Sequence, residues 1–210
     1  MTISTSTFGE KFAKELSVDT ISRYMSEYGE PQQPKSRHNK TQLGVKTEIA
    51  RFIRKYAAGA TNLLEIGGYT GWQTMLYRDC MNQSGNAQIY DWQDYRTPTV
   101  RQQIGFRRVD LETERFPAES GAFDVIVINQ VLEHLKNIFL PLTEICRVLK
   151  VGGHLAVSVP NICALHNLIL LMVGRQPTTT ELAELRMVSL ISIWPILYCR
   201  SPSSSTPGHQ

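Results

Sequence analysis

The stretch that decides the fold is Leu63-Leu64-Glu65-Ile66-Gly67-Gly68-Tyr69-Thr70-Gly71. Its first four residues predict a short buried strand, and the glycines that follow predict a tight turn. The residues from Trp72 to Cys80 continue with the pattern of a helix. A strand, a glycine turn and a helix N-terminus together present backbone N–H groups to a ligand, and a missing Cβ leaves room for its approach. The Gly-x-x-x-Gly spacing fits neither the dinucleotide fingerprint nor the phosphate loop, so this stretch alone leaves the ligand open.

Composition limits the classes of protein that this chain can belong to. Its 210 residues, 42% hydrophobic and 20% charged, are ordinary for one globular domain with a real core. A net charge of +3 is too small to indicate a nucleic-acid partner, and the four widely spaced cysteines predict no metal pair. The first residues lack the apolar run of a secretory signal, and no apolar run has the ~20 residues of a membrane helix. We therefore expect a cytoplasmic protein without a stable membrane span.

Further strands are predicted at regular intervals after the glycine turn. They cover Ala87–Tyr90, Phe106–Val109, Val125–Ile128 and His154–Val159. The continuous β-branched run of the third of these is typical of a strand buried on both faces of a parallel sheet. Strands alternating with helices predict an α/β fold with a doubly wound, mostly parallel sheet. The carboxyl ends of such strands lie along one edge, where ligands bind.

Helical spacing surrounds these strands. A helix is predicted from Gln42 to Ala58, and its basic residues, including Lys46, are expected on a solvated face. After the fourth strand, Val131–Leu135 and Leu140–Leu149 are predicted to be helical. Val151–Gly153 is then predicted as the turn into the last of the strands above.

The predicted strands end in residues that can bind a nucleoside. Asp91 follows Gly71 by about the interval at which an acidic residue accepts both hydroxyls of a ribose, although it can equally well cap its strand. Trp92 can lie flat against a purine or be an ordinary surface or core aromatic residue. Asp110 can accept an adenine amino group or cap the segment Leu111–Glu114.

Four motifs in order carry a resemblance to a known family. They are Leu64–Gly71, Phe123–Leu135, Glu144–Leu155 and Ser158–Asn161. Together they resemble the class I S-adenosylmethionine-dependent methyltransferases, in the small-molecule branch called type 11 or 23. The resemblance extends from about residue 43 to residue 177, and it implies a Rossmann-like methyltransferase fold with S-adenosyl-L-methionine as cofactor.

The resemblance also implies a set of cofactor-binding residues. These are Glu65, Gly67, Gly68, Tyr69 and Gly71 around the methionine part, Asp91 and Trp92 at the ribose and base, Asp110 and Leu111 at the adenine, and Asn129 and Gln130 beside the methyl group. One departure is that Tyr69 stands where the family usually has a middle glycine. Methyl transfer is an in-line displacement, so such a protein mainly positions a nucleophile.

His134 is the candidate catalytic residue. A histidine near the methyl group can take a proton from a hydroxyl, phenol or amine acceptor. Some quinone-biosynthesis relatives bind a divalent metal here through Glu-x-x-Glu-His, but Gln130 replaces the first carboxylate, so we predict no metal. The alternative is that Glu133 and His134 only cap or brace the segment after the fourth strand.

Four regions are expected along the chain. Residues 1–41 are N-terminal helices and a loop that can serve as a substrate cap, and residues 42–160 are the cofactor-binding core. Residues 161–186 form a lid or pocket helices, and residues 187–210 form an atypical apolar segment followed by a disordered tail. Because the resemblance fades there, we expect the C-terminal strand pair to be missing or altered, through truncation or a frameshift, with the last parallel strand exposed.

The sequence thus predicts an enzyme that transfers a methyl group to a small-molecule acceptor such as a sugar, a lipid-linked molecule or a secondary metabolite. The alternative is a catalytically idle, cofactor-binding relative that acts as an interaction protein or is a non-functional product.

Overall fold

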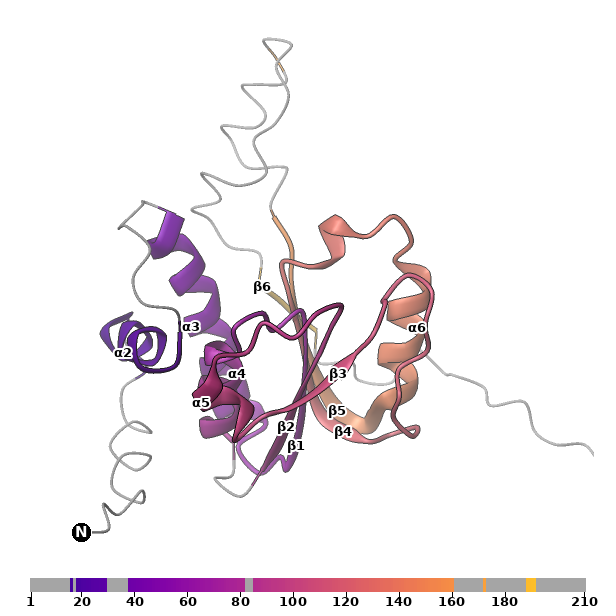
Figure 1. Ribbon diagram of the computed structural model, residues 1–210, viewed down its shortest axis with the longest axis horizontal. Coiled ribbons are helices and arrows are strands. Elements are labelled where there is room, and N and C mark those ends of the chain that lie inside the picture. Colours follow the sequence, from indigo (N-terminus) through magenta and orange to yellow (C-terminus); the bar gives the residue numbers. More distant parts are fainter. Residues whose placement is uncertain are drawn as a thin grey trace, which may run out of the picture.

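A six-stranded sheet forms the centre of the molecule. The computed structural model describes residues 16, 18–29, 38–81, 85–160, 172 and 188–191. The strands follow the spatial order β3-β2-β1-β4-β5-β6 (Figure 1). They are β1 (Asn62–Ile66), β2 (Asn86–Asp91), β3 (Gly105–Arg108), β4 (Phe123–Asn129), β5 (Leu149–Ser158) and β6 (Val188–Ile191). Neighbouring strands are parallel except for β5 and β6, which confirms the predicted mostly parallel sheet.

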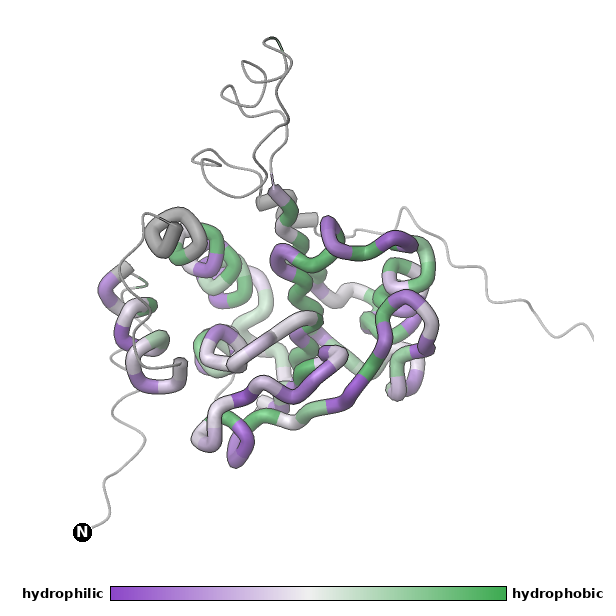
Figure 2. The backbone as a smooth tube through the Cα atoms, turned by 45° about the horizontal axis from the view of Figure 1, so that its top comes forward, coloured by the Kyte–Doolittle hydropathy of each residue, from purple (hydrophilic) through white to green (hydrophobic). Residues whose placement is uncertain are grey.

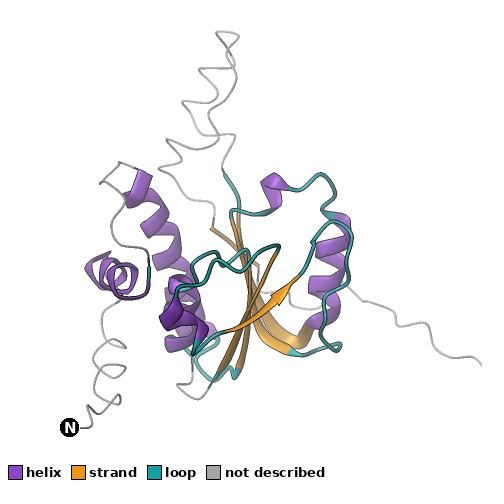
Figure 3. Cartoon of the chain, in the orientation of Figure 1, coloured by secondary structure: helices purple, strands orange, loops and turns teal. Residues whose placement is uncertain are grey.

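Helices cover both faces of this sheet (Figure 3). They are α2 (Val18–Tyr28), α3 (His38–Tyr56), α4 (Trp72–Asp79) and α5 (Pro98–Arg101) on one face and α6 (Phe139–Val148) on the other. Side chains alternate along β4, so Val125 and Val127 join the core under α3 and α4, whereas Ile126 and Ile128 join the core under α6. This two-sided burial explains the continuous β-branched run. Figure 2 shows that the strands at the centre of the molecule are rich in hydrophobic residues.

The strand order reverses direction at β1. This strand lies between β2 and β4, and Glu65 is in register with Ile89 on one side and Val127 on the other. In open α/β sheets, ligands bind beyond the carboxyl ends of the strands at such a switch point. The fold therefore places the glycine turn, residues 67–71, at the expected binding edge.

β5 begins earlier than predicted. It starts at Leu149, directly after α6, whereas the sequence predicted a turn at Val151–Gly153 and a strand from His154. Phe123 is in register with Leu149 and Val125 with His154, so β5 has extra residues at this point. Gly152 takes a positive φ of 78° within them. The predicted turn is thus an irregularity inside a strand.

One C-terminal strand is in place. β6 pairs antiparallel with residues Leu155–Ser158. The C-terminal pair is therefore not wholly missing, and over this register β5 is not an exposed edge as expected. Apart from Met172 and β6, the predicted lid and tail segments lie outside the described residues.

Two helical segments differ from their predictions. α3 begins at His38, within the segment interpreted as a polar loop, and residues 131–135 contain only a short 3₁₀ helix, η1 (Leu132–His134).

The N-terminal helix α2 packs on the core through buried Ile21 and Tyr24, and the Tyr24 hydroxyl donates to Asp79 Oδ2 at 2.6 Å. In the part of the chain that the structure describes, no helix has both the length and the apolar character to cross a membrane.

Candidate active site

The glycine turn has three residues in the left-handed region. The φ angles are 72° at Gly67, 49° at Tyr69 and 81° at Gly71. A Cβ on Gly67 would lie 2.4 Å from Val131 Cγ2, and one on Gly71 would lie 2.6 Å from Val100 Cγ1. The glycines are thus required by the turn and by close packing of neighbouring loops. The expectation that glycine clears space for a ligand therefore needs correction, because at these two positions protein side chains fill that space.

Tyr69 adopts the conformation that glycine usually supplies. A side chain in the left-handed region costs about 1 kcal/mol or more, and such strain persists where the surroundings impose it. The Tyr69 ring is 53% exposed and packs on Tyr95 with centroids 5.0 Å apart. Its backbone N–H donates to Asp91 Oδ2 at 3.3 Å. Tyr69 therefore joins the glycine turn to the loop after β2.

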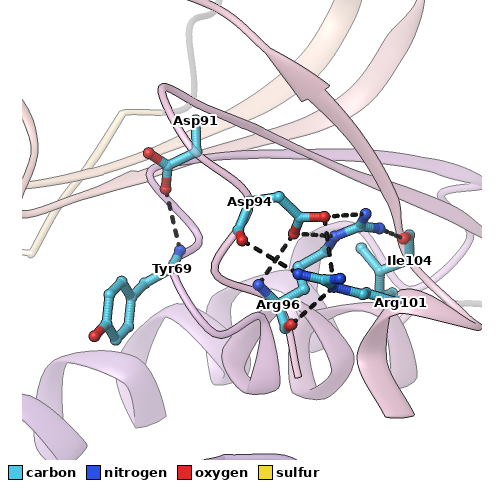
Figure 4. A network of polar contacts seen from close by, with 6 residues as sticks. All are labelled: Tyr69, Asp91, Asp94, Arg96, Arg101 and Ile104. Atoms are coloured by element: carbon cyan, nitrogen blue, oxygen red, sulfur yellow. Dashed lines mark hydrogen bonds and ion pairs between the residues drawn. The ribbon is translucent and has the colours of Figure 1, made fainter. Parts of the chain in front are cut away.

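Asp91 lies at the end of β2 with its carboxylate facing the glycine turn (Figure 4). Besides the N–H of Tyr69, it accepts the backbone N–H of Trp92 at 2.8 Å. Partial burial raises the pKa of Asp91, and these hydrogen bonds oppose that effect. A carboxylate has about four acceptor positions, so capacity for a diol remains. The capping and ribose-binding interpretations are therefore compatible.

Three aromatic rings border Asp91. Trp92 is 62% exposed and meets Tyr95 nearly edge-on with centroids 5.9 Å apart. Tyr69 packs on the same Tyr95 ring. We refer to Tyr69, Trp92 and Tyr95 as the aromatic rim. The sequence did not indicate Tyr95 as a site residue. Its connection to the glycine turn is the contact of its ring with the ring of Tyr69, which lies in a different loop.

An ion-pair network supports the loop after β2, which carries Trp92 and Tyr95 of the aromatic rim (Figure 4). The Arg96 guanidinium donates to both carboxylate oxygens of Asp94 at 2.9 Å and also to the carbonyl of Ile104. Arg101 donates from Nε to the Arg96 carbonyl at 3.1 Å. The hydrogen bond from Arg96 lowers the pKa of Asp94. These contacts fix the loop before any ligand binds.

Glu65 is fully buried below the turn. Its Oε2 accepts the Thr74 hydroxyl, while Oε1 has no hydrogen-bond partner among the described residues. Burial raises the pKa of Glu65 to about 7, against the opposing effects of Thr74 and Lys46. An unpartnered buried carboxylate oxygen is rare in folded proteins and marks a position where a donor is missing.

The prediction that Lys46 lies on a solvated face of α3 needs correction. Its ammonium is partly buried and lies 5.0 Å from the centroid of the Trp72 ring. Burial lowers the pKa of Lys46, and the nearby charge of Glu65 opposes this. The sequence pattern of a basic helix face offered no signal for this contact, because Trp72 is distant in the chain.

Asp110 and Leu111 follow β3. Asp110 is exposed; its Oδ1 accepts the Glu112 N–H at 2.9 Å, and its own N–H donates to Glu114 Oε2 at 2.8 Å. These bonds, led by that from Glu112, lower the pKa of Asp110. Leu111 packs against the core under α6. The alternative was a helix cap for Leu111–Glu114, but residues 111–113 form a turn and not a helix, so Asp110 caps a turn, and adenine binding stays a prediction.

Asn129 and Gln130 are held by β5. The Ser158 hydroxyl donates to Asn129 Oδ1, and the Gln130 N–H donates to the Ser158 carbonyl at 2.9 Å. Gln130 has a positive φ of 55°. This strained residue turns the chain away from the sheet at the carboxyl end of β4.

His134 lies on η1 with an exposed side chain, and so does Glu133. Its imidazole makes no hydrogen bond or ion pair with any residue that the structure describes. The following loop is tied down instead by Glu112, whose Oε1 accepts the backbone N–H groups of Lys136 and Asn137, the latter at 3.3 Å. Within the described ranges, no three His, Cys, Asp or Glu side chains gather as metal ligands would.

The comparisons with known proteins agree with this fold. A model of the type 23 methyltransferase domain family matches residues 31–187, and the chain therefore belongs to that family. The resemblance in the sequence is thereby confirmed. Among functionally curated proteins, no sequence matches the chain.

The chain is also similar to several solved structures. An S-adenosylmethionine-dependent methyltransferase from Archaeoglobus fulgidus superposes with a TM-score of 0.51 at 17% identity, covering 76% of this chain and 68% of that one. YcgJ from Bacillus subtilis gives 0.45 at 17% identity, with coverage of 52% and 48%. A methyltransferase from Mesorhizobium loti gives 0.46 at 16% identity, with coverage of 56% and 54%. The chain thus spans about half the length of the latter two, and at these identities the likeness is one of fold alone.

Proposed function

We propose that this protein transfers the methyl group of S-adenosyl-L-methionine to a small-molecule acceptor by in-line displacement. The observation that carries the proposal is Asp91. Its carboxylate is held at the end of β2 by backbone N–H groups of Tyr69 and Trp92, at the edge where ligands bind in this fold. A carboxylate held in this way can accept both hydroxyls of a ribose.

The residues present fit the cofactor. Asp91 would hold the ribose, with Trp92, Asp110 and Leu111 around the adenine. Glu65 has an unsatisfied buried oxygen, which suits the ammonium of an amino acid. The remaining members of the proposed cofactor site border the methionine part: Gly67, Gly68, Tyr69, Gly71, Asn129 and Gln130.

The bound cofactor supplies a methyl group on a positively charged sulfur, which is a reactive electrophile. The protein's part is to hold the acceptor in line and to exclude competing groups. His134, exposed on η1 after β4, would take the proton that a hydroxyl, phenol or amine loses as it is methylated. No metal is part of the proposal.

The acceptor is proposed as a sugar, a lipid-linked molecule or a secondary metabolite, and not a nucleic acid. The cytoplasm is proposed as its location, since the thiol of Cys80 forms no disulfide with any residue that the structure describes, which agrees with a reducing compartment. Fractionation of cells that express the full chain tests this location.

Two measurements test the proposed function. Calorimetric titration of the full chain with S-adenosylmethionine and with S-adenosylhomocysteine should show one site for each. A screen of metabolite extracts with methyl-labelled cofactor should then transfer label to a small molecule. A folded protein without affinity for either ligand would refute the proposal. Binding without transfer to any acceptor would favour the idle, cofactor-binding alternative.

A further inference from the structure

Lys46 is a cation in an unusual place. It lies on α3 with its ammonium partly buried and placed over the ring of Trp72, which directly follows the glycine turn. Within the described part of the chain, no carboxylate lies at ion-pair distance from it. A lysine on a helix surface normally keeps its ammonium in water, because burying the charge costs free energy. The aromatic face of Trp72 offsets only part of that cost.

The buried counterpart is Glu65. Its Oε1 has no hydrogen-bond partner among the residues that the structure describes, although the residue is 0% exposed. Lys46 and Glu65 act on each other electrostatically, yet they do not form an ion pair. Each therefore keeps bonding capacity: three N–H donors on the ammonium and an acceptor on the carboxylate.

The two groups flank the glycine turn. Glu65 precedes Gly67 on β1, and Lys46 is fixed to Trp72 just beyond Gly71. Two opposite charges that lie close together without forming an ion pair can each bind one of the two charges of a zwitterion. An amino-acid head group has this charge pattern, with a carboxylate for the lysine and an ammonium for the glutamate.

We propose that Lys46 binds the α-carboxylate of the methionine part of S-adenosylmethionine, with Glu65 opposite its ammonium. The inference rests on the proposed function, and it assigns recognition of the amino-acid end to a residue of α3. The contact between the Lys46 ammonium and the Trp72 ring places the charge beside the glycine turn before the ligand arrives. The site thus distinguishes a nucleoside with an intact amino acid from one without it.

The test uses three ligands that differ in the amino-acid end. They are S-adenosylhomocysteine, its decarboxylated analogue, and 5′-methylthioadenosine, which lacks the amino acid. Lys46→Met keeps the apolar stem and removes the charge. It should weaken S-adenosylhomocysteine binding by about tenfold or more, as expected for a lost charge-assisted hydrogen bond. The dissociation constants of the other two ligands should change by less than about twofold.

Lys55 supplies a matched control on the same helix. Its ammonium also lies over an aromatic ring, 4.9 Å from the centroid of Tyr56, but the residue is exposed. Lys55→Met should leave the affinity for all three ligands unchanged. Lys46→Arg keeps a charge and should recover most of the S-adenosylhomocysteine affinity. Thermal unfolding of each variant checks that the fold is intact, and Lys46→Gln replaces Lys46→Met if that variant does not fold.

The outcomes separate the inference from the proposed function. If Lys46→Met weakens all three ligands equally, or none of them, Lys46 does not bind the carboxylate and the inference is wrong, while the proposed function stands. If the unmodified protein binds none of the three ligands, the proposed function itself fails.

Discussion

The two sides of the candidate site are built differently. Around β1 and β2, the glycine turn, Asp91 and the aromatic rim are linked by backbone hydrogen bonds, ring contacts and the Asp94–Arg96 ion pair. Around the end of β4, Glu133 and His134 lie exposed on a single 3₁₀ turn. The β1–β2 side is therefore held in place by contacts within the protein, whereas the side chains of Glu133 and His134 on the β4 side are exposed.

This difference matches the chemistry proposed for each side. A shared cofactor can be bound by a fixed arrangement, and preorganised groups lose little entropy on binding. An acceptor differs from enzyme to enzyme, so its side is where members of one fold diverge. We therefore expect substitutions on the β1–β2 side to change stability and cofactor affinity, and substitutions on the β4 side to change turnover.

The largest effect is expected at His134. If it accepts the proton of the acceptor, His134→Ala should lower kcat by about 10²- to 10⁴-fold. Cofactor affinity should stay unchanged, because His134 is not among the residues proposed to bind the cofactor. Steady-state kinetics with an acceptor found in the screen, paired with calorimetry, measures both quantities. Equal turnover in the variant would leave His134 with a structural role only.

Gly67→Ala tests the rigidity of the glycine turn. The new Cβ would meet Val131 Cγ2 at 2.4 Å in a left-handed conformation, so the free energy of unfolding should fall by roughly 2–5 kcal/mol. Gly152→Ala is the matched control, since Gly152 also has a positive φ but nothing lies within 4 Å of its Cβ position. It should lose only ~1–2 kcal/mol of backbone strain. Urea denaturation of both variants decides this, and equal losses would show that Val131 moves aside.

Glu65 should make stability depend on pH. Burial raises its pKa from 4.5 to about 7, so the folded protein holds this proton where the unfolded chain releases it. Stability from this group is therefore lost as pH rises from about 4.5 to 7, by up to roughly 3 kcal/mol. Glu65→Gln should remove that slope from a plot of unfolding free energy against pH.

Glu144 provides the opposite case. It is also buried, but its hydrogen bond from Arg147 lowers its pKa, so its contribution is present at neutral pH and lost on acidification. Glu144→Gln should thus remove stability at pH 7 and leave the Glu65 slope in place. An unchanged slope in Glu65→Gln would mean that Glu65 ionises normally in the folded protein.

Asp91→Ala tests the cofactor side directly. Loss of the ribose contacts should weaken binding of S-adenosylmethionine by ~1–3 kcal/mol, or about fivefold to 150-fold. Asp91→Asn keeps the shape and one acceptor oxygen, so it should lose less. Calorimetry supplies both dissociation constants. If neither variant changes them, the ribose does not lie at Asp91.

The β1–β2 side was also the side that the sequence predicted best. The strand β1, the glycine turn and the acidic residue at the end of β2 each depend on a local pattern of residues. Lys46 and Tyr95 were missed because their roles depend on contacts with Trp72 and Tyr69, which are distant in the sequence. The predicted start of β5, at His154, was too late for a related reason. β5 pairs with β4 on both sides of the irregularity that contains Gly152, and the periodicity of a sequence does not indicate how two strands pair.

The smallest effect is expected at Tyr69, which belongs to the rigid side and is strained. Tyr69→Ala removes the ring contact with Tyr95 but keeps a Cβ at a φ of 49°. It should lose ~0.5–1.5 kcal/mol of unfolding free energy. Tyr69→Gly loses the same contact but relieves the backbone, so it should be more stable than Tyr69→Ala by about 1 kcal/mol.

Tyr69→Phe keeps the ring and should match the unmodified protein, which makes it the control for the hydroxyl. Urea denaturation of the three variants separates the two contributions of Tyr69. If the Ala and Gly variants are equally stable, the turn relaxes when the ring is removed. The strain at Tyr69 would then be a consequence of the contact with Tyr95, and the rigidity of this side would depend on the aromatic rim more than on the glycine turn.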